Sequence, residues 1–311
     1  MIKFYLHTEI EKDKWNRCIA EATFKTIFAE YDYLTLASPN WVALIKGDYE
    51  YVMPLPIRSK LSIQYIYTPF FFSQLGVFSK KEITNQLIND FINHIPRAYK
   101  QVDLILNPSN PVDNIDIHTI RFNSYFLKLN RPYLLMQQLF SENCRRNIKS
   151  AEKNSLAIAN DVQVSDIINL FKANKGRDKA VHYHPRDYSL LHSLSELALK
   201  DKKLEIIGAR LDNGKLIAGA LFLHDYDRIL FWFSGRDKHF YDKKAMFFVV
   251  NEYLKLKENC ELILDFNGSM NINIARFYRG FGAELYQYSM INFTRVFYLY
   301  PLIRFYKAII K

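Results

Sequence analysis

The sequence has few cysteines and none in a paired motif. Cys18, Cys144 and Cys260 are widely separated, and no CxxC pair occurs. Isolated cysteines are typical of reduced thiols in a reducing compartment, and they provide neither a disulfide framework nor a structural zinc site. We therefore expect a cytoplasmic protein that holds no metal.

A long apolar run and an N-terminal signal peptide are also missing. No apolar run reaches the roughly 18 residues that a membrane-spanning helix needs. Residues 1–7 alternate between polar and apolar side chains, as a strand does, and lack the hydrophobic region of a signal peptide. Both absences again favour the cytoplasm.

Acidic residues are outnumbered by basic ones. The 311 residues include 42 Lys and Arg against 32 Asp and Glu, which gives a net charge of +10. This balance indicates an anionic partner, such as a phosphate-bearing cofactor, a nucleotide-sugar, tRNA or a lipid surface. A well-solvated basic surface is the alternative. Apolar residues make up 49% of the chain, enough for a large core, and the length suggests two domains.

The second half has the pattern of a mixed α/β domain. Asn213-Gly214, a pair that favours a tight hairpin, joins the first two strands of a three-strand meander. A helix with apolar residues at helical spacing, a strand and a short helix follow, and two helices precede. The strands are expected at 204–211, 216–224, 229–233 and 262–266, and the helices at 164–175, 186–200, 246–254 and 271–281. An antiparallel meander joined to such a unit makes a mixed sheet.

The first half repeats this order more loosely. We expect strands at 41–46, 50–57, 63–67, 102–106 and 122–129, and a helix at 80–95. Corresponding features lie about half the chain apart: 167 residues separate Gly47 from Gly214, and 163 separate Lys80 from Lys243. A persistent offset favours duplication of one fold. Coincidence between two ordinary α/β domains is the alternative.

A strong helix is expected between the halves. The predicted parts are an N-terminal domain at 1–133, this linking helix at 134–155 and a C-terminal domain at 156–311. The helix has an apolar stripe formed by Phe140, Cys144, Ile148 and Ala151. Three basic residues lie largely outside the stripe and are candidates for binding an anionic substrate: Arg145, Arg146 and Lys149. A solvated helix face is the alternative.

One motif in the second half resembles a signature of the GNAT acyltransferase fold. Residues 271–283 read Asn-Ile-Asn-Ile-Ala-Arg-Phe-Tyr-Arg-Gly-Phe-Gly-Ala. In the GNAT motif an Asn and an Ala lead to a Tyr, and a Gly follows after three residues. The spacing from Asn271 to Tyr278 and the place of Gly282 match. Ala275 stands one place late, and Ala283 replaces the usual aromatic residue.

The doubled order, the basic stretch 145–153 and the stretch 265–269 together resemble the FemABX-like branch of this fold. Those are tandem GNAT-fold enzymes, and they include peptidoglycan aminoacyltransferases that use aminoacyl-tRNA. The resemblance covers essentially the whole chain. It implies an α/β protein with a mixed sheet, built as two tandem GNAT-like domains joined by a basic helix.

The resemblance also implies a donor site between the third meander strand and the helix after it. GNAT enzymes that bind acyl-CoA usually carry a glycine-rich loop there, whereas 235–245 lacks the paired glycines, as FemABX-like enzymes do. A helix N-terminus still binds phosphate through its free N–H groups. We leave acyl-CoA and aminoacyl-tRNA open as donors. The implied site consists of Ser234, Gly235, Arg236, Lys243, Lys244 and Ala245.

Two residues are candidates for the chemistry of acyl transfer. In GNAT-like sites the oxyanion is stabilised by backbone N–H groups, here at 233–235, and Tyr278 would protonate the leaving group. Asp265, at the end of its strand, is a candidate base or a contact for the acceptor amine. The alternatives are a tyrosine packed in the core and a carboxylate that caps the turn at 267–269.

The loop between the two upstream helices borders the acceptor in this fold. Asn174, Lys175 and His184 are therefore candidates for acceptor binding. The pattern His182-Tyr183-His184 has no further ligand cluster, so surface histidines are the alternative to a metal pair. The basic segment 301–311 is expected to form a helix, either docked on the sheet or in peripheral contact with the inner membrane face.

These features, with the resemblance, predict an acyl- or aminoacyl-transferase that acts on an amine of an anionic small molecule or cell-envelope precursor, with tRNA as a further candidate partner. Ordinary N-acetylation from acyl-CoA is one alternative. A duplicated fold that has lost catalysis and binds an anionic ligand is another.

Overall fold

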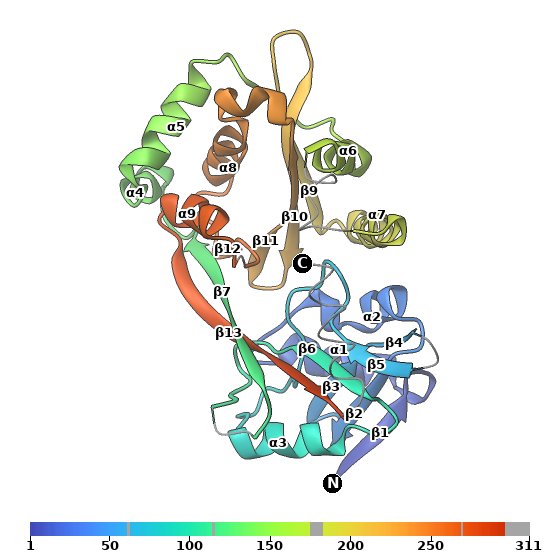
Figure 1. Ribbon diagram of the computed structural model, residues 1–311. Coiled ribbons are helices and arrows are strands. Elements are labelled where there is room, and N and C mark those ends of the chain that lie inside the picture. Colours follow the sequence, from blue (N-terminus) through green and yellow to red (C-terminus); the bar gives the residue numbers. More distant parts are fainter. Residues whose placement is uncertain (61–62, 114–115, 175–182, 269, 296–311) are drawn as a thin grey trace. The chain divides into compact units, whose positions relative to one another are not determined.

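The computed structural model describes residues 1–60, 63–113, 116–174, 183–268 and 270–295, and in these ranges the chain forms two compact units (Figure 1). Unit 1 comprises Met1–Phe122 with the described part of Gln287–Ile309, and unit 2 comprises Asn123–Tyr286. The expected mixed α/β class is confirmed. None of the described helices is both long and apolar enough to cross a bilayer.

The units follow different limits from those expected at residues 133 and 155. The first limit falls inside strand β7 (Thr119–Lys128), and strand β13 (Glu284–Thr294) begins in unit 2 and ends in unit 1. Two strands, and not one helix, therefore run from unit to unit. Hydrophobic periodicity marks the elements but carries no information on which of them pair.

Unit 1 contains two sheets whose strands diverge at Pro56. One sheet has the antiparallel order β1-β2-β3, and the other joins β4, β5, β6 and the end of β13. The chain leaves one sheet and enters the other at this residue, so the expected meander at 41–67 is divided between the sheets. The strands are β1 (Ile2–Leu6), β2 (Val42–Lys46), β3 (Tyr51–Leu55), β4 (Ile57–Lys60), β5 (Ile63–Tyr67) and β6 (Gln101–Ile105).

The helices of unit 1 are short. They are η1 (His7–Glu9), α1 (Lys12–Glu21), η2 (Ile27–Ala29), α2 (Tyr31–Ala37) and α3 (Asn85–His94). Helix α3 begins five residues later than expected because Thr84 caps it, its hydroxyl accepting a hydrogen bond from the Leu87 N–H. Helix α3 connects β5 to β6, and these two strands are parallel.

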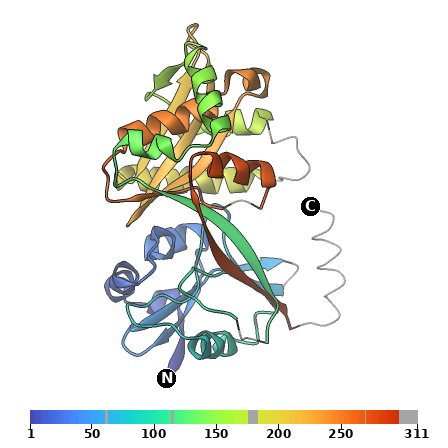
Figure 2. The ribbon, with the colours of Figure 1, turned by 90° about the vertical axis from the view of Figure 1, so that its left-hand side faces the viewer.

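Unit 2 contains six consecutive strands of a ten-strand sheet, in the order β7-β12-β11-β10-β9-β8, and among these six only the β11–β12 pair is parallel. Its remaining strands are β8 (Ala157–Ala159), β9 (Leu204–Arg210), β10 (Leu216–Asp225), β11 (Arg228–Arg236) and β12 (Ile263–Asp265). One face is covered by α5 (Glu142–Glu152) and α8 (Ala245–Leu256), and the other by α6 (Val164–Asn174) and α7 (Pro185–Lys200) (Figure 1, Figure 2). The elements expected at 164–281 are present with small shifts at their ends.

The single helix expected at 134–155 is two helices, α4 (Tyr133–Gln138) and α5. The break has a local cause. The Ser141 hydroxyl accepts a hydrogen bond from the Cys144 N–H and so caps a new helix, while the Ser141 N–H donates to the Gly280 carbonyl. The expected apolar stripe from Phe140 to Ala151 is buried against the core of unit 2.

A cluster of hydrogen bonds fixes α8 to strand β9. The Glu205 carboxylate accepts from the Tyr253 hydroxyl at 2.7 Å and from the Lys257 ammonium at 2.6 Å, and the His224 ring lies 3.3 Å away. The Tyr253 ring stacks on Phe222, with 3.5 Å between ring centroids. Burial alone would raise the pKa of the Glu205 carboxyl, but hydrogen bonds from His224, Lys257 and Tyr253 outweigh it and lower that pKa to about 2.

We predict that Glu205→Gln lowers the free energy of unfolding at pH 7 by about 1–2 kcal/mol, a range that allows for solvent screening of this partly exposed group. The folded pKa lies below the unfolded value of about 4.3, so the carboxylate stabilises the fold above about pH 5 and ceases to do so as the pH falls toward 2. Urea unfolding at pH 7 and pH 3 tests this. An equal difference between wild type and variant at both pH values would contradict it.

Candidate active site in unit 2

The site begins where two parallel strands separate. Strands β11 and β12 pair over only three residues, and the last pair is Leu230 opposite Asp265. Strand β11 then continues to Arg236 alongside β10. A wedge therefore opens between β11 and β12, at the carboxyl ends of both strands.

A β-bulge at Trp232 shapes the wall of this wedge. Leu221 lies opposite Phe233 while Phe222 lies opposite Phe231, so Trp232 is the extra residue in β11. As a result, Phe231 packs against Tyr278 and Phe233 against Phe171 on the other side.

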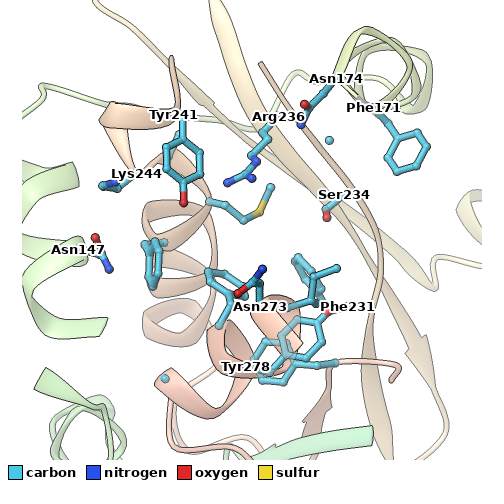
Figure 3. Close-up of a pocket in the computed structure, with 18 of the residues that line it drawn as sticks. Asn147, Phe171, Asn174, Phe231, Ser234, Arg236, Tyr241, Lys244, Asn273 and Tyr278 are labelled. Atoms are coloured by element: carbon cyan, nitrogen blue, oxygen red, sulfur yellow. The ribbon is translucent and has the colours of Figure 1, made fainter. Parts of the chain in front are cut away.

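A cavity of about 790 Å³ occupies the wedge and extends between the helices (Figure 3). This volume lies in the usual range for small-molecule sites. Its walls come from β11, from α5, α6 and α8, from the 3₁₀ helix η3 (Lys238–Lys243) and from α9 (Ile272–Gly280). Five of the six residues expected at the donor site line it: Ser234, Gly235, Arg236, Lys244 and Ala245.

One end of the cavity is cationic. Arg236 and Lys244 flank the Tyr241 ring, and each cationic group lies 4.6 Å from the ring centroid (Figure 3). Lys244 is also the N-cap of α8, has a left-handed backbone (φ 55°) and provides no side-chain cap. Lys244 therefore stands at the N-terminus of α8, a place that favours anions, and Arg236 contacts the same tyrosine ring from the end of β11.

The one carboxylate that lines the cavity among the described residues is already compensated. Asp237 lies 3.0 Å from the Lys215 ammonium, and it caps η3 by accepting a hydrogen bond from the His239 N–H. The field at this end of the cavity is therefore positive.

Tyr278 lies at the other end of the cavity, on α9. Its ring stacks on Phe266 with 4.6 Å between centroids and contacts Phe231 and Tyr125. Burial, and then the nearby charge of Asp265, raise the pKa of the Tyr278 hydroxyl above its ordinary value. The hydroxyl forms no hydrogen bond with any residue that the structure describes.

The structure places Asp265 outside the cavity, contrary to the expectation that it faces the cleft. The carboxylate is buried and accepts hydrogen bonds from the Ser124 and Tyr286 hydroxyls and from the Asn267 N–H, at 2.9, 2.6 and 2.8 Å. Arg228 lies 3.8 Å away. Burial raises the pKa of the Asp265 carboxyl, although these partners act against it. Asp265 thus binds the backbone N–H group of Asn267, in the turn that follows β12.

The other expected site residues are scattered. Arg145, Arg146 and Lys149 are exposed on α5 and do not line the cavity. His184 caps α7, and its ring accepts a hydrogen bond from the Arg186 N–H. Lys243 bonds to Asn154 and Asp242 instead. Asn174 lines the cavity, whereas Lys175 lies outside the described residues.

Three asparagines are among the cavity residues that sequence reasoning missed. Asn143 and Asn147 line the cavity from α5, and Asn273 does so from the first turn of α9, close to Tyr278 (Figure 3). The side-chain amide groups of Asn143 and Asn273 form no hydrogen bond with a described side chain or backbone group, so they are available to a ligand. The spacing of Asn143 and Asn147, one helical turn apart, is a signal that the sequence did contain. No three His, Cys, Asp or Glu side chains of the described chain gather as metal ligands.

Parts of the sequence and of the fold are similar to known proteins. Residues 139–254 match a family model described as an acetyltransferase (GNAT) domain. The crystal structure of FemX is similar, with 13% identity and a TM-score of 0.68 over 95% of this chain and 98% of FemX. L-PGS from Bacillus licheniformis has 10% identity and a TM-score of 0.57 over 97% and 98% of the two chains. No curated protein matches the sequence.

A conserved protein of unknown function from Bacteroides thetaiotaomicron is also similar, with 9% identity and a TM-score of 0.58 over 94% of this chain and 99% of that one. At such identities the neighbours establish the fold, and the family model establishes the domain. The expected GNAT fold is thereby confirmed, and FemX shares it.

The close packing of α6 on β11 leads to one prediction. A Cβ atom at Gly235 would lie 2.5 Å from the Ile167 carbonyl oxygen and 2.7 Å from the Phe171 nitrogen, so α6 must shift to admit it. We expect Gly235→Ala to cost about 1–3 kcal/mol in the free energy of unfolding. Thermal unfolding measures this, with Ser234→Ala as the matched control in the same strand. Equal stability of the two variants would show that α6 yields without cost.

Proposed function

From a chain that contains a GNAT domain, we propose an enzyme that transfers an acyl or aminoacyl group to an amine of an anionic small molecule or cell-envelope precursor. The coarser class, a GNAT-fold acyltransferase, follows from the family model and the neighbours. The observation that carries the proposal is one cavity with two cations at one end and the Tyr278 hydroxyl at the other.

The reaction needs positioning more than covalent help. Donor phosphates bind Arg236 and Lys244, and the donor chain lies in the wedge between β11 and β12. The acceptor amine attacks the acyl carbon, and the oxyanion that forms is stabilised by N–H groups of 233–235. As the carbon–sulfur or carbon–oxygen bond of the donor breaks, Tyr278 gives its proton to the leaving group and regains one from the attacking nitrogen.

Asp265 contributes to this chemistry at a distance. Burial, and then the charge of Asp265, raise the pKa of the Tyr278 hydroxyl, which is in its protonated form at neutral pH. It also fixes the turn at Asn267, which lines the cavity. We therefore assign it a positioning role in place of the base considered from the sequence.

The choice of donor and acceptor stays open between two classes. Absence of paired glycines at 235–245 favours aminoacyl-tRNA over acyl-CoA. The name of one neighbour, the C-terminal domain of a putative lysylphosphatidylglycerol synthetase from Agrobacterium fabrum, favours a lipid acceptor. Incubation with acyl-CoA, and separately with charged tRNA, distinguishes the donors. Thermal stabilisation by a donor without product would favour the non-catalytic binding module instead.

Three further expectations remain proposals. Duplication of one fold is supported by the parallel pairs β5–β6 and β11–β12, each joined through a helix. A cytoplasmic location and tRNA as a partner rest on charge, cysteine usage and the resemblance. The basic segment 301–311, considered as a contact with the inner membrane face, lies outside the described residues.

The role of Tyr278 is tested by Tyr278→Phe. Removing the hydroxyl takes away the proton donor and keeps the stacked ring, so turnover should fall by roughly 10²–10⁴-fold. Stability should change by no more than about 1 kcal/mol. The control is Tyr125→Phe, because Tyr125 is a buried tyrosine beside Tyr278 that does not line the cavity. Unchanged turnover in Tyr278→Phe would make the residue part of the core.

The donor site is tested by a pair of adjacent lysines. Lys244 lines the cavity and Lys243 does not, although both were expected at the donor site from the sequence. We expect Lys244→Glu to weaken donor binding by about tenfold or more and to flatten its salt dependence, because a charge-assisted contact is lost. Lys243→Glu should leave binding nearly unchanged. Titration calorimetry over several salt concentrations measures both, and equal effects would place the donor elsewhere.

A further inference from the structure

One side of unit 2 exposes apolar side chains next to unpaired arginines. On α9 and the residue pair before it, Ile272 is 69% exposed and Met270 is 60% exposed. Arg276 and Arg279 are exposed on the same helix, and neither forms an ion pair with a described residue. Exposed apolar side chains that lie together, in contrast to single ones, mark surfaces that contact a partner or a membrane.

The spacing places these residues on one face of α9. Ile272, Arg276 and Arg279 stand at i, i+4 and i+7, and so they project from the same side of the helix. Ala275 and Tyr278, one turn apart, are buried on the other side. The solvent-exposed face of α9 therefore combines an apolar isoleucine with two arginines.

The exposed apolar surface continues onto α4. The Ser141 N–H donates to the Gly280 carbonyl at 2.8 Å, and Leu139 packs directly over Gly282, so the end of α4 adjoins the end of α9. Leu139 and Leu135, one turn apart, are 46% and 48% exposed. We call the set Leu135, Leu139, Met270, Ile272, Arg276 and Arg279 the α4–α9 surface.

The charge of the α4–α9 surface indicates which kind of partner it binds. The charged members of the α4–α9 surface are Arg276 and Arg279, and the exposed acids Glu142 and Glu284 lie just beyond its ends. Apolar side chains flanking arginines suit the boundary between lipid headgroups and acyl chains, because the leucines and isoleucine enter the apolar layer while guanidinium groups reach phosphates. We infer that the α4–α9 surface docks unit 2 on an anionic bilayer.

Docking there would hold the candidate site at the lipid surface. Arg276 both belongs to the α4–α9 surface and lines the cavity, and Asn273 lines it from the next position around α9. An acceptor carried in the bilayer would then enter the cavity beside α9. Docking of this surface does not depend on whether the transfer reaction takes place.

Vesicle binding by the whole chain tests the inference. Vesicles of phosphatidylcholine with phosphatidylglycerol should retain the protein more strongly than vesicles of phosphatidylcholine alone, and added salt should reduce the difference. Ile272→Asp should lower binding roughly tenfold or more, because a side chain that enters the bilayer is lost. Arg279→Gln should lower binding about fivefold. The matched control is Leu256→Asp, since Leu256 is a comparably exposed leucine, at 65%, outside the surface.

Several outcomes would overturn the inference. One is equal binding to both kinds of vesicle, and another is equal binding by wild type, Ile272→Asp and Arg279→Gln, with unaltered thermal unfolding confirming that the variants fold. Binding that is lost on removal of residues 296–311 but kept in Ile272→Asp would assign the contact to that segment. A dimer that Leu135→Asp dissolves, without any change in vesicle binding, would make a second copy the partner. None of these results bears on turnover, so the proposed reaction is judged separately.

Discussion

The candidate site depends on one constraint, which is that parallel pairing of β11 and β12 ends after three residues. Asp265 is the last paired residue, and its carboxylate turns away from the ladder to bind Ser124, Tyr286 and the Asn267 N–H. Because of those hydrogen bonds, the chain leaves the sheet directly after Asp265. The bulge at Trp232 acts on the opposite strand at nearly the same level. Two strands that stayed paired would leave no room between them, and neither Tyr278 nor Arg236 would face a common cavity.

The elements of unit 2 could be predicted from the sequence because their signals are local. Apolar spacing at 246–254, the turn at Asn213-Gly214 and the motif that ends at Gly282 each need only a few neighbouring residues. The expectations that were wrong depended on non-local strand pairing, or on a local pattern that a stronger local interaction outweighed. Ser141 divides the expected linking helix because its cap and its bond to Gly280 outweigh a continuous apolar stripe. The split at Pro56 depends on which strands pair, which periodicity does not encode.

The residues of the candidate site were also predicted only in part. Residues of β11 and of the first turn of α8 were identified because they follow the resemblance position by position. Charge was a poorer guide, since Arg145, Arg146 and Lys149 were chosen for their sign and lie on the solvent face of α5. The uncharged Asn143 and Asn147 point into the cavity from the same helix. Which face of a helix meets a cavity is fixed by tertiary packing, and here the buried stripe at Cys144 and Ile148 sets it.

Strand β13 has a consequence for how the chain is made. Its residues Met290–Thr294 pair with β6, which ends at Ile105, so unit 1 receives one of its strands from a part of the chain that is synthesised well over a hundred residues later. An emerging N-terminal half on the ribosome would expose the free edge of β6 until some two hundred further residues had followed. Synthesis order and assembly order therefore differ in this molecule. Exposed strand edges attract other chains, so a chaperone or rapid completion of translation would protect the unfinished protein.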